Sequence, residues 1–310
     1  MKTPIISIII PNWNGEKQLG KNLPLLAKAL SGSKIKTEVI VVDDASSDNS
    51  LMVLAEIKKK KIFQKFIILK KEINRGFADS VNQGVSLAQA ELVFLLNTDV
   101  VVKSGCFESL LPHFKNPNTF AVGANADWKR GVINFKNGFL DLSSAKEVFS
   151  KTTGSSFSFW VSGGHSLFRK SIWQKLGGLD LLFAPFYFEE TDLCYRAWKR
   201  GYQIIWESKA RVDHRHEESV IRQNFSNQKI NFVAQRNQLF FIWKNIHDSK
   251  MITDHCFNLL KRLIYQPKYV GVFLTAGLKL LQILTKRRLE KRLAVLSDRE
   301  VFEKISNQAS

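Results

Sequence analysis

The sequence predicts an α/β fold in which helices flank a central, mostly parallel sheet, followed by a helical, basic C-terminal tail. Short β-branched runs alternate with helix-like segments near the N-terminus, and this alternation is typical of parallel strands joined by right-handed helical crossovers. Polar residues also gather directly after several of these runs. The chain has 310 residues, 45% of them apolar, so it can bury a large core and is not a disordered polypeptide.

The apolar runs are too short for helices and are bounded by turn residues, which favours buried strands. The intervening segments have apolar residues at helical spacing. Beyond residue 124 the pattern loosens, and residues 125–157 are expected to hold a variable insertion. The expected strands are 5–10, 38–42, 66–69, 92–96, 166–168 and 203–206, and the expected helices are 22–30, 51–61, 77–88, 170–176 and 190–200.

Polar clusters follow three of the predicted strands at their carboxyl ends. Residues Asn12–Gly15 follow the first strand, Asp43 and Asp44 the second, and Asn97–Asp99 the fourth. Ligands of open α/β sheets bind outside the carboxyl ends of the strands, so these clusters predict one shared site. The first strand is not followed by GxGxxG and no GxxxxGKS or GxxxxGKT occurs, which argues against a dinucleotide-binding fold and a P-loop NTPase.

Carboxylates at strand ends suit a hard divalent cation that bridges phosphate oxygens. Asp99 fits that role, and it could equally cap the helix that follows. Of Asp43 and Asp44, one is expected to contact a nucleotide and the other to be structural, because adjacent carboxylates repel each other. Arg75 either holds the phosphate or base of a nucleotide or is simply exposed to solvent.

Three carboxylates, Glu189, Glu190 and Asp192, lie at the start of a predicted helix. The helix dipole favours acidic residues there, so a structural origin stays open. The aromatic residues just before them would raise a carboxylate pKa and suit it for general-base catalysis. Two histidines, His214 and His216, follow the last predicted strand, and either could ligate a metal.

The C-terminal part of the chain is basic. Residues 220–310 contain 16 Lys and Arg against 6 Asp and Glu, so they carry +10 of the total net charge of +18. A basic cluster at 286–292 flanks the apolar stretch 270–284, which suits either an interfacial helix on anionic lipid or an ordinary helix packed on the body. Nucleic acid is not an expected partner, because the aromatic residues do not interleave with the basic ones.

The cysteines and the distribution of apolar residues both favour a protein of the cell interior. The three cysteines form no CxxC pair, which favours a reducing compartment. The apolar run at the N-terminus is too short for a signal peptide, and no uninterrupted apolar stretch of about 20 residues occurs. We therefore expect a cytoplasmic protein that is soluble or peripheral on the inner face of the cell membrane.

Six sequence blocks occur in a fixed order along the first two thirds of the chain. They are Ser7–Gly15, Val41–Asp48, Asn74–Ala78, Leu95–Asp99, Gly177–Asp180 and Glu189–Cys194, followed by Arg196, Gly201, Tyr202, His214 and Ser219. This set resembles the family 2 glycosyltransferases of the GT-A (nucleotide-diphospho-sugar transferase) fold, and within them the bacterial rhamnosyltransferase-like branch. The resemblance covers about residues 4–220, so we expect a catalytic domain over 1–220 and a mostly helical, basic, membrane-associating extension over 221–310.

The resemblance implies an activity. A member of this family moves a sugar from a nucleotide-diphosphate donor to a hydroxyl of a saccharide or lipid-linked acceptor, with inversion at the anomeric carbon, in surface polysaccharide synthesis. The expected donor is a UDP- or dTDP-sugar, and the expected cofactor is a divalent cation, Mg²⁺ or Mn²⁺.

The resemblance also implies roles for single residues. Asn97 stands where the family's DxD motif often has its first acid, and Glu190 stands where Asp is commoner, so Asp192 is kept as a second candidate base. The implied roles are nucleotide binding for Pro11, Trp13, Asn14, Asp43, Asp44, Arg75 and Asn97, metal binding for Asp99 and His214, base catalysis for Glu190, and contact with acceptor or sugar for Gly163, Gly164, His165 and Glu189.

Two other functions remain open at this point. A basic membrane- or nucleic-acid-binding module with a degenerate catalytic body would explain the tail, but the carboxylates at the strand ends are intact. A nucleotidyltransferase would need a glycine-rich, basic loop after the first strand, which Pro11–Gly15 is not. The two enzymes differ in product, since one releases a nucleoside diphosphate and the other pyrophosphate.

Overall fold

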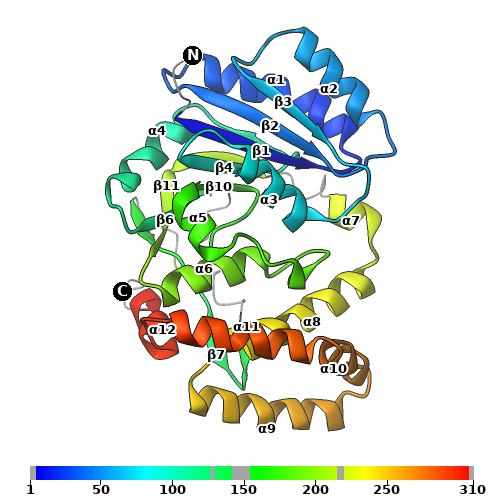
Figure 1. Ribbon diagram of the computed structural model, residues 1–310, viewed down its shortest axis with the longest axis vertical. Helices are drawn as coiled ribbons and strands as arrows, with labels where there is room; N and C mark the ends of the chain where they lie inside the picture. The colour runs from blue at the N-terminus through cyan, green and yellow to red at the C-terminus, as the bar shows by residue number, and fades with distance from the viewer. Residues whose placement is uncertain (1–4, 127–129, 142–153, 215–219, 307–310) are drawn as a thin grey trace.

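The computed structural model describes residues 5–126, 130–141, 154–214 and 220–306. A twisted sheet lies between two layers of helices, and the C-terminal helices gather at the end of the molecule opposite α1 and α2 (Figure 1). The fold is the predicted α/β class, with a helical C-terminal part.

The main sheet has nine strands within the described residues, in the order β3-β2-β1-β4-β10-β6-β11-β5, and β9 pairs with β11. β1 is parallel to β2 and β4, and β2 is parallel to β3, as predicted. β10 is antiparallel to β4 and β6, so the second half of the sheet is mixed. The strands are β1 Ile6–Asn12, β2 Thr37–Asp43, β3 Phe66–Lys70, β4 Leu92–Leu96, β5 Val100–Val102, β6 Thr119–Asn125, β9 Ser155–Phe157, β10 His165–Arg169 and β11 Gln203–His214, with a separate hairpin of β7 Asn134–Lys136 and β8 Phe139–Asp141.

Apolar layers cover both faces of the central strands. In β1, Ile6, Ile8 and Ile10 face the layer of α1, α2 and α4, whereas Ile9 faces the layer of α3 and α6. Burial on both faces explains why these strands appear in the sequence as unbroken apolar runs. The helices are α1 Glu16–Ser31, α2 Ser50–Lys59, α3 Phe77–Leu87, α4 Cys106–Leu110, α5 Lys170–Leu176, α6 Glu189–Lys199, α7 Val220–Asn224, α8 Asn227–Asn245, α9 Ser249–Tyr265, α10 Tyr269–Gly277, α11 Leu280–Leu293 and α12 Asp298–Ser306, with 3₁₀ turns η1 Leu111–Lys115 and η3 Leu181–Phe183.

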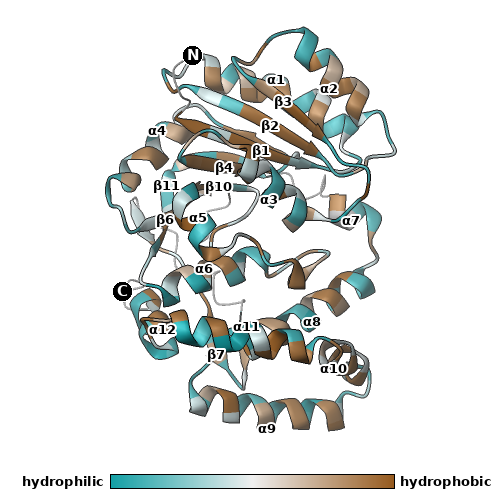
Figure 2. Cartoon of the chain, viewed as in Figure 1, coloured by the Kyte–Doolittle hydropathy of each residue, from teal (hydrophilic) through white to brown (hydrophobic). Residues whose placement is uncertain are grey.

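The C-terminal helices share a core with the sheet. Phe240 and Phe241 of α8 belong to the same buried apolar cluster as Leu193 and Tyr195 of α6. Apolar residues, coloured brown, recur along α9 and α10 (Figure 2), and Phe257, Leu260 and Leu274 are among those that are exposed. No single helix among the described residues is long and apolar enough to cross a membrane, although α10 and α11 together, bent by 68°, pass that test by length and composition.

The prediction of strands is confirmed for the first four apolar runs, but it is incomplete in the rest of the sheet. The last predicted strand, 203–206, continues to His214 as β11, with a register irregularity between Glu207 and Arg211 that interrupts its pattern. His214 therefore ends a strand instead of following one. β5 and β6 are additional strands in the segment between the fourth predicted strand and the insertion.

Candidate active site

A cavity of about 470 Å³ opens at the carboxyl ends of β1, β2 and β4. Its volume is in the range of small-ligand sites. Five of the residues expected at the nucleotide and metal, Pro11, Trp13, Asp44, Asn97 and Asp99, line it. The other lining residues are Asn12, Asn74, Gly76, Phe77, Ser80, Thr98, Pro185, Phe186, Val220 and Phe225.

Asp43 holds the loops of the site together. Its buried carboxylate accepts hydrogen bonds from Asn12 Nδ2 at 2.8 Å and from Ser46 Oγ at 2.6 Å. Asn14 has a similar place, since its Oδ1 accepts from the Ser47 N–H at 2.8 Å and its φ is +50°. Neither Asp43 nor Asn14 is among the residues that line the cavity. Of the adjacent pair, Asp43 is thus the structural carboxylate.

Asp44 organises the opposite wall of the cavity. It is buried, forms an ion pair with Lys71 at 2.6 Å, and accepts hydrogen bonds from the N–H groups of Arg75 at 2.9 Å and Gly76 at 2.7 Å. Asp44 therefore fixes the turn before α3. The Arg75 side chain is exposed and does not line the cavity, so the sequence prediction for this side chain is corrected: its main chain, and not its guanidinium, contributes here.

Asp99 and His214 are brought together by strand pairing. β5 begins directly after Asp99, and it pairs antiparallel with the end of β11 so that His214 lies opposite Val100. The Asp99 Oδ2 atom lies 3.5 Å from His214 Nε2. The His165 ring is a further 5.8 Å from the His214 ring, between centroids. His216 lies outside the described residues.

A divalent cation fits the Asp99 side chain. Its Oδ1 atom is buried and has no hydrogen-bond partner among the described residues. An orphaned carboxylate oxygen beside an imidazole offers hard ligands of the kind that Mg²⁺ and Mn²⁺ take. No group of three or more candidate ligands occurs within the described ranges, so substrate phosphates and water would have to complete the coordination.

Two adjacent glycines connect Glu190 with the edge of the cavity. Its Oε1 atom accepts a hydrogen bond from the Gly163 N–H at 3.1 Å, and Gly164 accepts one from the Asn97 N–H at 2.9 Å. A Cβ atom at Gly163 would lie 2.8 Å from Glu190 Cγ, and one at Gly164 would lie 2.6 Å from Asn97 Nδ2. Only glycine at both positions lets this loop touch Glu190 on one side and the cavity wall on the other.

Burial changes the acidity of the two adjacent glutamates. Burial raises the pKa of Glu190, although the Gly163 hydrogen bond opposes this effect. The pKa of Glu189 is raised further by burial and by the charge of Glu190. The Glu189 Oε2 atom has no hydrogen-bond partner among the described residues. A carboxylate that is desolvated in this way is a stronger proton acceptor, as the aromatic residues before α6 predicted.

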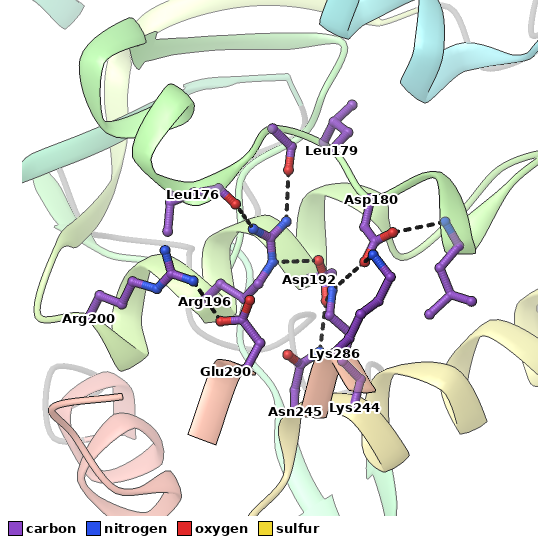
Figure 3. A network of polar contacts seen from close by, with 12 residues as sticks. Leu176, Leu179, Asp180, Asp192, Arg196, Arg200, Lys244, Asn245, Lys286 and Glu290 are labelled. Carbon is purple, nitrogen blue, oxygen red and sulfur yellow. Dashed lines mark hydrogen bonds and ion pairs between the residues drawn. The ribbon is translucent and has the colours of Figure 1, made fainter. Parts of the chain in front are cut away.

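Asp192 is not available as a base. Its Oδ2 atom accepts from Arg196 Nε at 2.7 Å, and its Oδ1 atom accepts from Lys244 Nζ at 2.7 Å and Asn245 Nδ2 at 2.8 Å (Figure 3). Both oxygens of this fully buried carboxylate are thus held by cationic or amide donors. The prediction of Asp192 as a second candidate base is corrected, and Asp192 anchors α6 instead.

Sequence reasoning missed the aromatic wall of the cavity. Phe186 and Phe225 pack with ring centroids 5.0 Å apart, and Phe225 lies 6.5 Å from Trp13. These three rings come from distant parts of the chain. Phe186 lies in the aromatic run before α6, so its neighbourhood was visible, but nothing in the sequence around Phe225 indicated a site.

Comparison with known proteins is consistent with this geometry. Residues 7–177 match the family model described as Glycosyl transferase family 2. A poly-beta-1,6-N-acetyl-D-glucosamine synthase of Staphylococcus epidermidis is 28% identical over 188 residues, which are 60% of this chain and 44% of that protein. The same enzyme of Staphylococcus aureus strain COL is 27% identical over 185 residues, 59% of this chain and 43% of that protein. The chain thus matches less than half of the length of these relatives.

Solved structures show the same fold. The mannosyltransferase PcManGT of Pyrobaculum calidifontis, in complex with GDP-Man and Mn²⁺, has a TM-score of 0.60 at 14% identity and covers 94% of this chain and 86% of its own. Residues 1–349 of Staphylococcus aureus TarS, in complex with UDP-GlcNAc, have a TM-score of 0.58 at 14% identity, covering 93% of this chain and 83% of the other.

Proposed function

This chain belongs to glycosyl transferase family 2, and from that membership and the geometry of its site we propose that it transfers a sugar from a nucleotide-diphosphate donor to an acceptor hydroxyl with inversion. One observation carries the proposal. The half-buried side chain of Glu190, whose pKa is raised by its partial burial, is held by Gly163 beside the strand-end residues Asn97–Asp99 that border the cavity.

The cavity supplies the donor site of this proposal. Trp13 and Phe186 give it apolar walls suited to a base and ribose, and Asp44 gives it a carboxylate. Asp99 and His214 are the residues that would hold a divalent cation, Mg²⁺ or Mn²⁺. When bound, the cation neutralises the charge of the diphosphate, which makes it a better leaving group.

Glu190 is the general base of the proposed reaction. It removes the proton from an acceptor hydroxyl, whose oxygen forms a bond to the anomeric carbon on the face opposite the diphosphate. The bond from that carbon to the diphosphate oxygen breaks in the same step, and the electron pair leaves with the nucleoside diphosphate. A single displacement inverts the configuration, so no covalent intermediate with the protein is needed.

The proposed substrates follow from the relatives. The staphylococcal relatives are named for a polymer of N-acetylglucosamine, and one structural neighbour holds UDP-GlcNAc. We propose a UDP- or dTDP-sugar as donor and a saccharide or lipid-linked acceptor of surface polysaccharide synthesis. Residues 1–220 would form the catalytic domain, and 221–310 the extension that completes its core.

We further propose that the protein lies peripherally on the inner face of the cell membrane through α9, α10 and α11. Part of the predicted basic cluster points inward, since Lys286 pairs with Asp180 and Arg287 donates to the Ile246 carbonyl. The remaining exposed cations lie among exposed apolar side chains, a combination that suits anionic lipid. The exposed apolar residues are Phe257, Leu260, Ile264, Leu274, Leu278 and Leu281, and the exposed cations are Lys261, Lys268, Lys279, Arg288, Lys291 and Arg292.

Sedimentation with lipid vesicles tests this surface. We expect binding to phosphatidylglycerol vesicles, weaker binding to phosphatidylcholine vesicles, and loss of binding in a double Leu278→Glu, Leu281→Glu variant. Met52, which is 57% exposed on α2 at the other end of the molecule, gives a matched Met52→Glu control that keeps binding. Equal binding by the double variant and the control would refute the proposed surface.

Thermal unfolding with nucleotides tests the donor site. The melting temperature is measured with UDP, dTDP, GDP and CDP, each with and without Mn²⁺. A ligand at 100 times its Kd adds about 2.7 kcal/mol to the free energy of unfolding, so one nucleotide should raise the midpoint, and only with Mn²⁺. An Asp99→Asn variant should lose this rise. No rise with any nucleotide would favour the degenerate binding module.

Product analysis tests the reaction itself. With the donor sugar of the selected nucleotide, the wild type should release the nucleoside diphosphate, whereas a nucleotidyltransferase would release pyrophosphate. A Glu190→Gln variant should still show the nucleotide-dependent rise in melting temperature but lose transfer. Normal turnover by Glu190→Gln would show that another group is the base.

A further inference from the structure

Helix α8 of the C-terminal extension packs along the turn that leads into α6 (Figure 1). Phe240 lies 6.4 Å from Phe183 and Phe241 lies 5.9 Å from Phe188, between ring centroids. These contacts place one face of α8 over residues 183–188, which end directly before Glu189. The extension therefore touches the segment that delivers both glutamates.

One side chain on this face holds three carbonyls of the turn. The buried Asn237 Nδ2 donates to the oxygens of Phe183 at 2.6 Å, Phe186 at 2.9 Å and Tyr187 at 2.9 Å. Arg236 fixes the orientation of this amide, because its Nη2 donates to Asn237 Oδ1 at 2.8 Å. The same Arg236 Nη2 donates to the Ala184 carbonyl at 2.6 Å. These two neighbouring residues of α8 thus bind four carbonyls within residues 183–187.

The turn needs such support because its backbone is strained. Tyr187 has φ +72° and Phe188 has φ +77°, both in the left-handed region that bulky residues rarely adopt. Strain of this kind persists only where the surroundings fix it, and it is often found at active sites. Asn237 binds the carbonyl of Tyr187, one of these two residues, and that of Phe186, which directly precedes them.

We propose that Asn237, oriented by Arg236, is a positioning residue that holds the turn 183–188 so that Glu190 meets Gly163 at the edge of the cavity. The proposal rests on the assignment of Glu190 as the base. It adds that a residue of the C-terminal extension, without touching substrate, sets the geometry of catalysis. We call the contacts of Arg236 and Asn237 with this turn the clamp. The turn also carries Pro185 and Phe186, which line the cavity, so the clamp also shapes the cavity wall.

The clamp has a consequence for the acidity of Glu190. When the turn loosens, more water reaches the half-buried Glu190 side chain, and the desolvation that raises its pKa is reduced. A base must be ionised to act, so the acidic limb of the pH–rate profile moves to lower pH when the pKa falls. A residue that served stability alone would lower the amount of folded enzyme and leave this limb where it is.

The test compares Asn237→Ala with Gln238→Ala in the full-length chain. Gln238 is the next residue of α8, and its Nε2 also donates to a backbone carbonyl, that of Leu140 in β8 at 2.9 Å, away from the turn. Both variants lose an amide side chain from the same helix turn. Hydrogen exchange over residues 184–193 measures how firmly the turn is held, and the turnover of the donor measures catalysis. The donor is the sugar nucleotide that the wild type cleaves fastest among UDP-GlcNAc, UDP-Glc, dTDP-rhamnose and GDP-mannose.

We expect Asn237→Ala to speed hydrogen exchange over residues 184–193 and to lower kcat by about 10- to 100-fold. The acidic limb of its kcat profile should also move to lower pH. Gln238→Ala should stay close to wild type in exchange, kcat and pH profile. Equal exchange over 184–193 in the two variants would overturn the clamp, whatever the activities. Faster exchange with an unchanged kcat and pH limb would overturn the positioning role. Full activity of Glu190→Gln would instead overturn the proposed function and leave the exchange result standing.

Discussion

The glutamate pair at the start of α6 shows how burial prepares a side chain for chemistry. Glu190 is half-buried and accepts a hydrogen bond from the Gly163 N–H, whereas Glu189 is buried. Burial raises the pKa of Glu190, and the pKa of the adjacent Glu189 is raised further by burial and by the charge of Glu190. The pair therefore binds protons at a higher pH than two exposed glutamates would.

This shift predicts the pH dependence of the reaction. Activity needs the ionised base, so the rate falls as the pH drops through the raised pKa, and the acidic limb of kcat should lie above pH 4.3, the ordinary value for glutamate. The pH–rate profile of the wild type measures this limb. Because the pKa of Glu189 is raised further than that of Glu190, Glu189 is neutral where Glu190 titrates, so a Glu189→Gln variant should leave the limb in place. A shift of the limb to lower pH in this variant would show that Glu189 is charged beside Glu190.

Gly163 gives a second test at the scale of single residues. A methyl group there would lie 2.8 Å from Glu190 Cγ, so a Gly163→Ala substitution must displace the base. A displacement of about 1 Å can cost about 100-fold in rate, and we expect a loss of that order in kcat with little change in nucleotide binding. Gly32, where a methyl group meets nothing within 4 Å, provides the control: Gly32→Ala should behave as wild type. Equal kcat in the two variants would contradict the placement of Glu190.

At the scale of elements, α6 is anchored by a buried charge network that extends into α8 and α11 (Figure 3). Lys244 lies between Asp180 and Asp192, 2.7 Å from an oxygen of each. Burial opposes the ionisation of Asp180, but the Lys244 ammonium outweighs it and lowers the pKa of Asp180. Because this pKa is lowered, the stabilisation is present above the unfolded pKa of about 3.9 and is lost as the pH falls below it.

Removing Lys244 should therefore be costly. A Lys244→Met substitution removes the shared cation from the fully buried Asp192 and from Asp180, whose side chain is 10% exposed. We expect it to lower the free energy of unfolding by about 3 kcal/mol at pH 7, measured by urea denaturation. Lys286 is the matched control, since it lies 3.1 Å from Asp180 with 34% of its side chain exposed. Lys286→Met should cost less than about 1 kcal/mol. Equal losses would mean that burial does not set the strength of these pairs.

The elements that could be predicted from sequence are those whose pattern is local. β1, β2 and β4 are unbroken apolar runs because both faces of each are covered, and their ends were predicted to within about two residues. β11 was predicted four residues long and has twelve, since the register irregularity between Glu207 and Arg211 hides its alternation. β5 has only three residues, too few for any periodicity, and it forms because β11 lies beside it.

Some roles in the candidate site could likewise be predicted from local sequence, and others could not. The strand-end clusters of Asp44 and Asp99 were predicted because the position of such loops follows from the topology of a parallel sheet. The loop-fixing role of Asp43 and the anchoring of Asp192 depend on partners that lie far away in sequence. Phe225 reaches the cavity only through the packing of α7, which no local pattern encodes.

At the scale of the whole molecule, the C-terminal extension completes the core. Residues from α8, α9, α10, α11 and α12 belong to one buried apolar cluster with α3, α5, α6 and the sheet. Without the extension, this face of the core would meet water, at a cost of about 25 cal/mol for each Å² of apolar surface.

A fragment of residues 1–220 should therefore fail to fold alone. We expect it to be insoluble or to unfold without a cooperative transition in urea, whereas the full-length chain unfolds cooperatively, as followed by circular dichroism. A cooperative transition in the fragment would show that the sheet and α6 form an independent unit. Removal of residues 307–310, which lie outside the described helices, is the control for truncation as such and should leave the transition unchanged.

The pairing of β5 with the end of β11 has a consequence for the order in which the protein is made. Asp99 leaves the ribosome 115 residues before His214, its neighbour across the site. Asn237 and Lys244, which secure the turn and helix that carry Glu190, are synthesised later still. Contacts between segments so distant along the chain form late and slow the folding of the whole domain. The growing polypeptide thus cannot assemble its reactive centre before Asn237 and Lys244 have been synthesised.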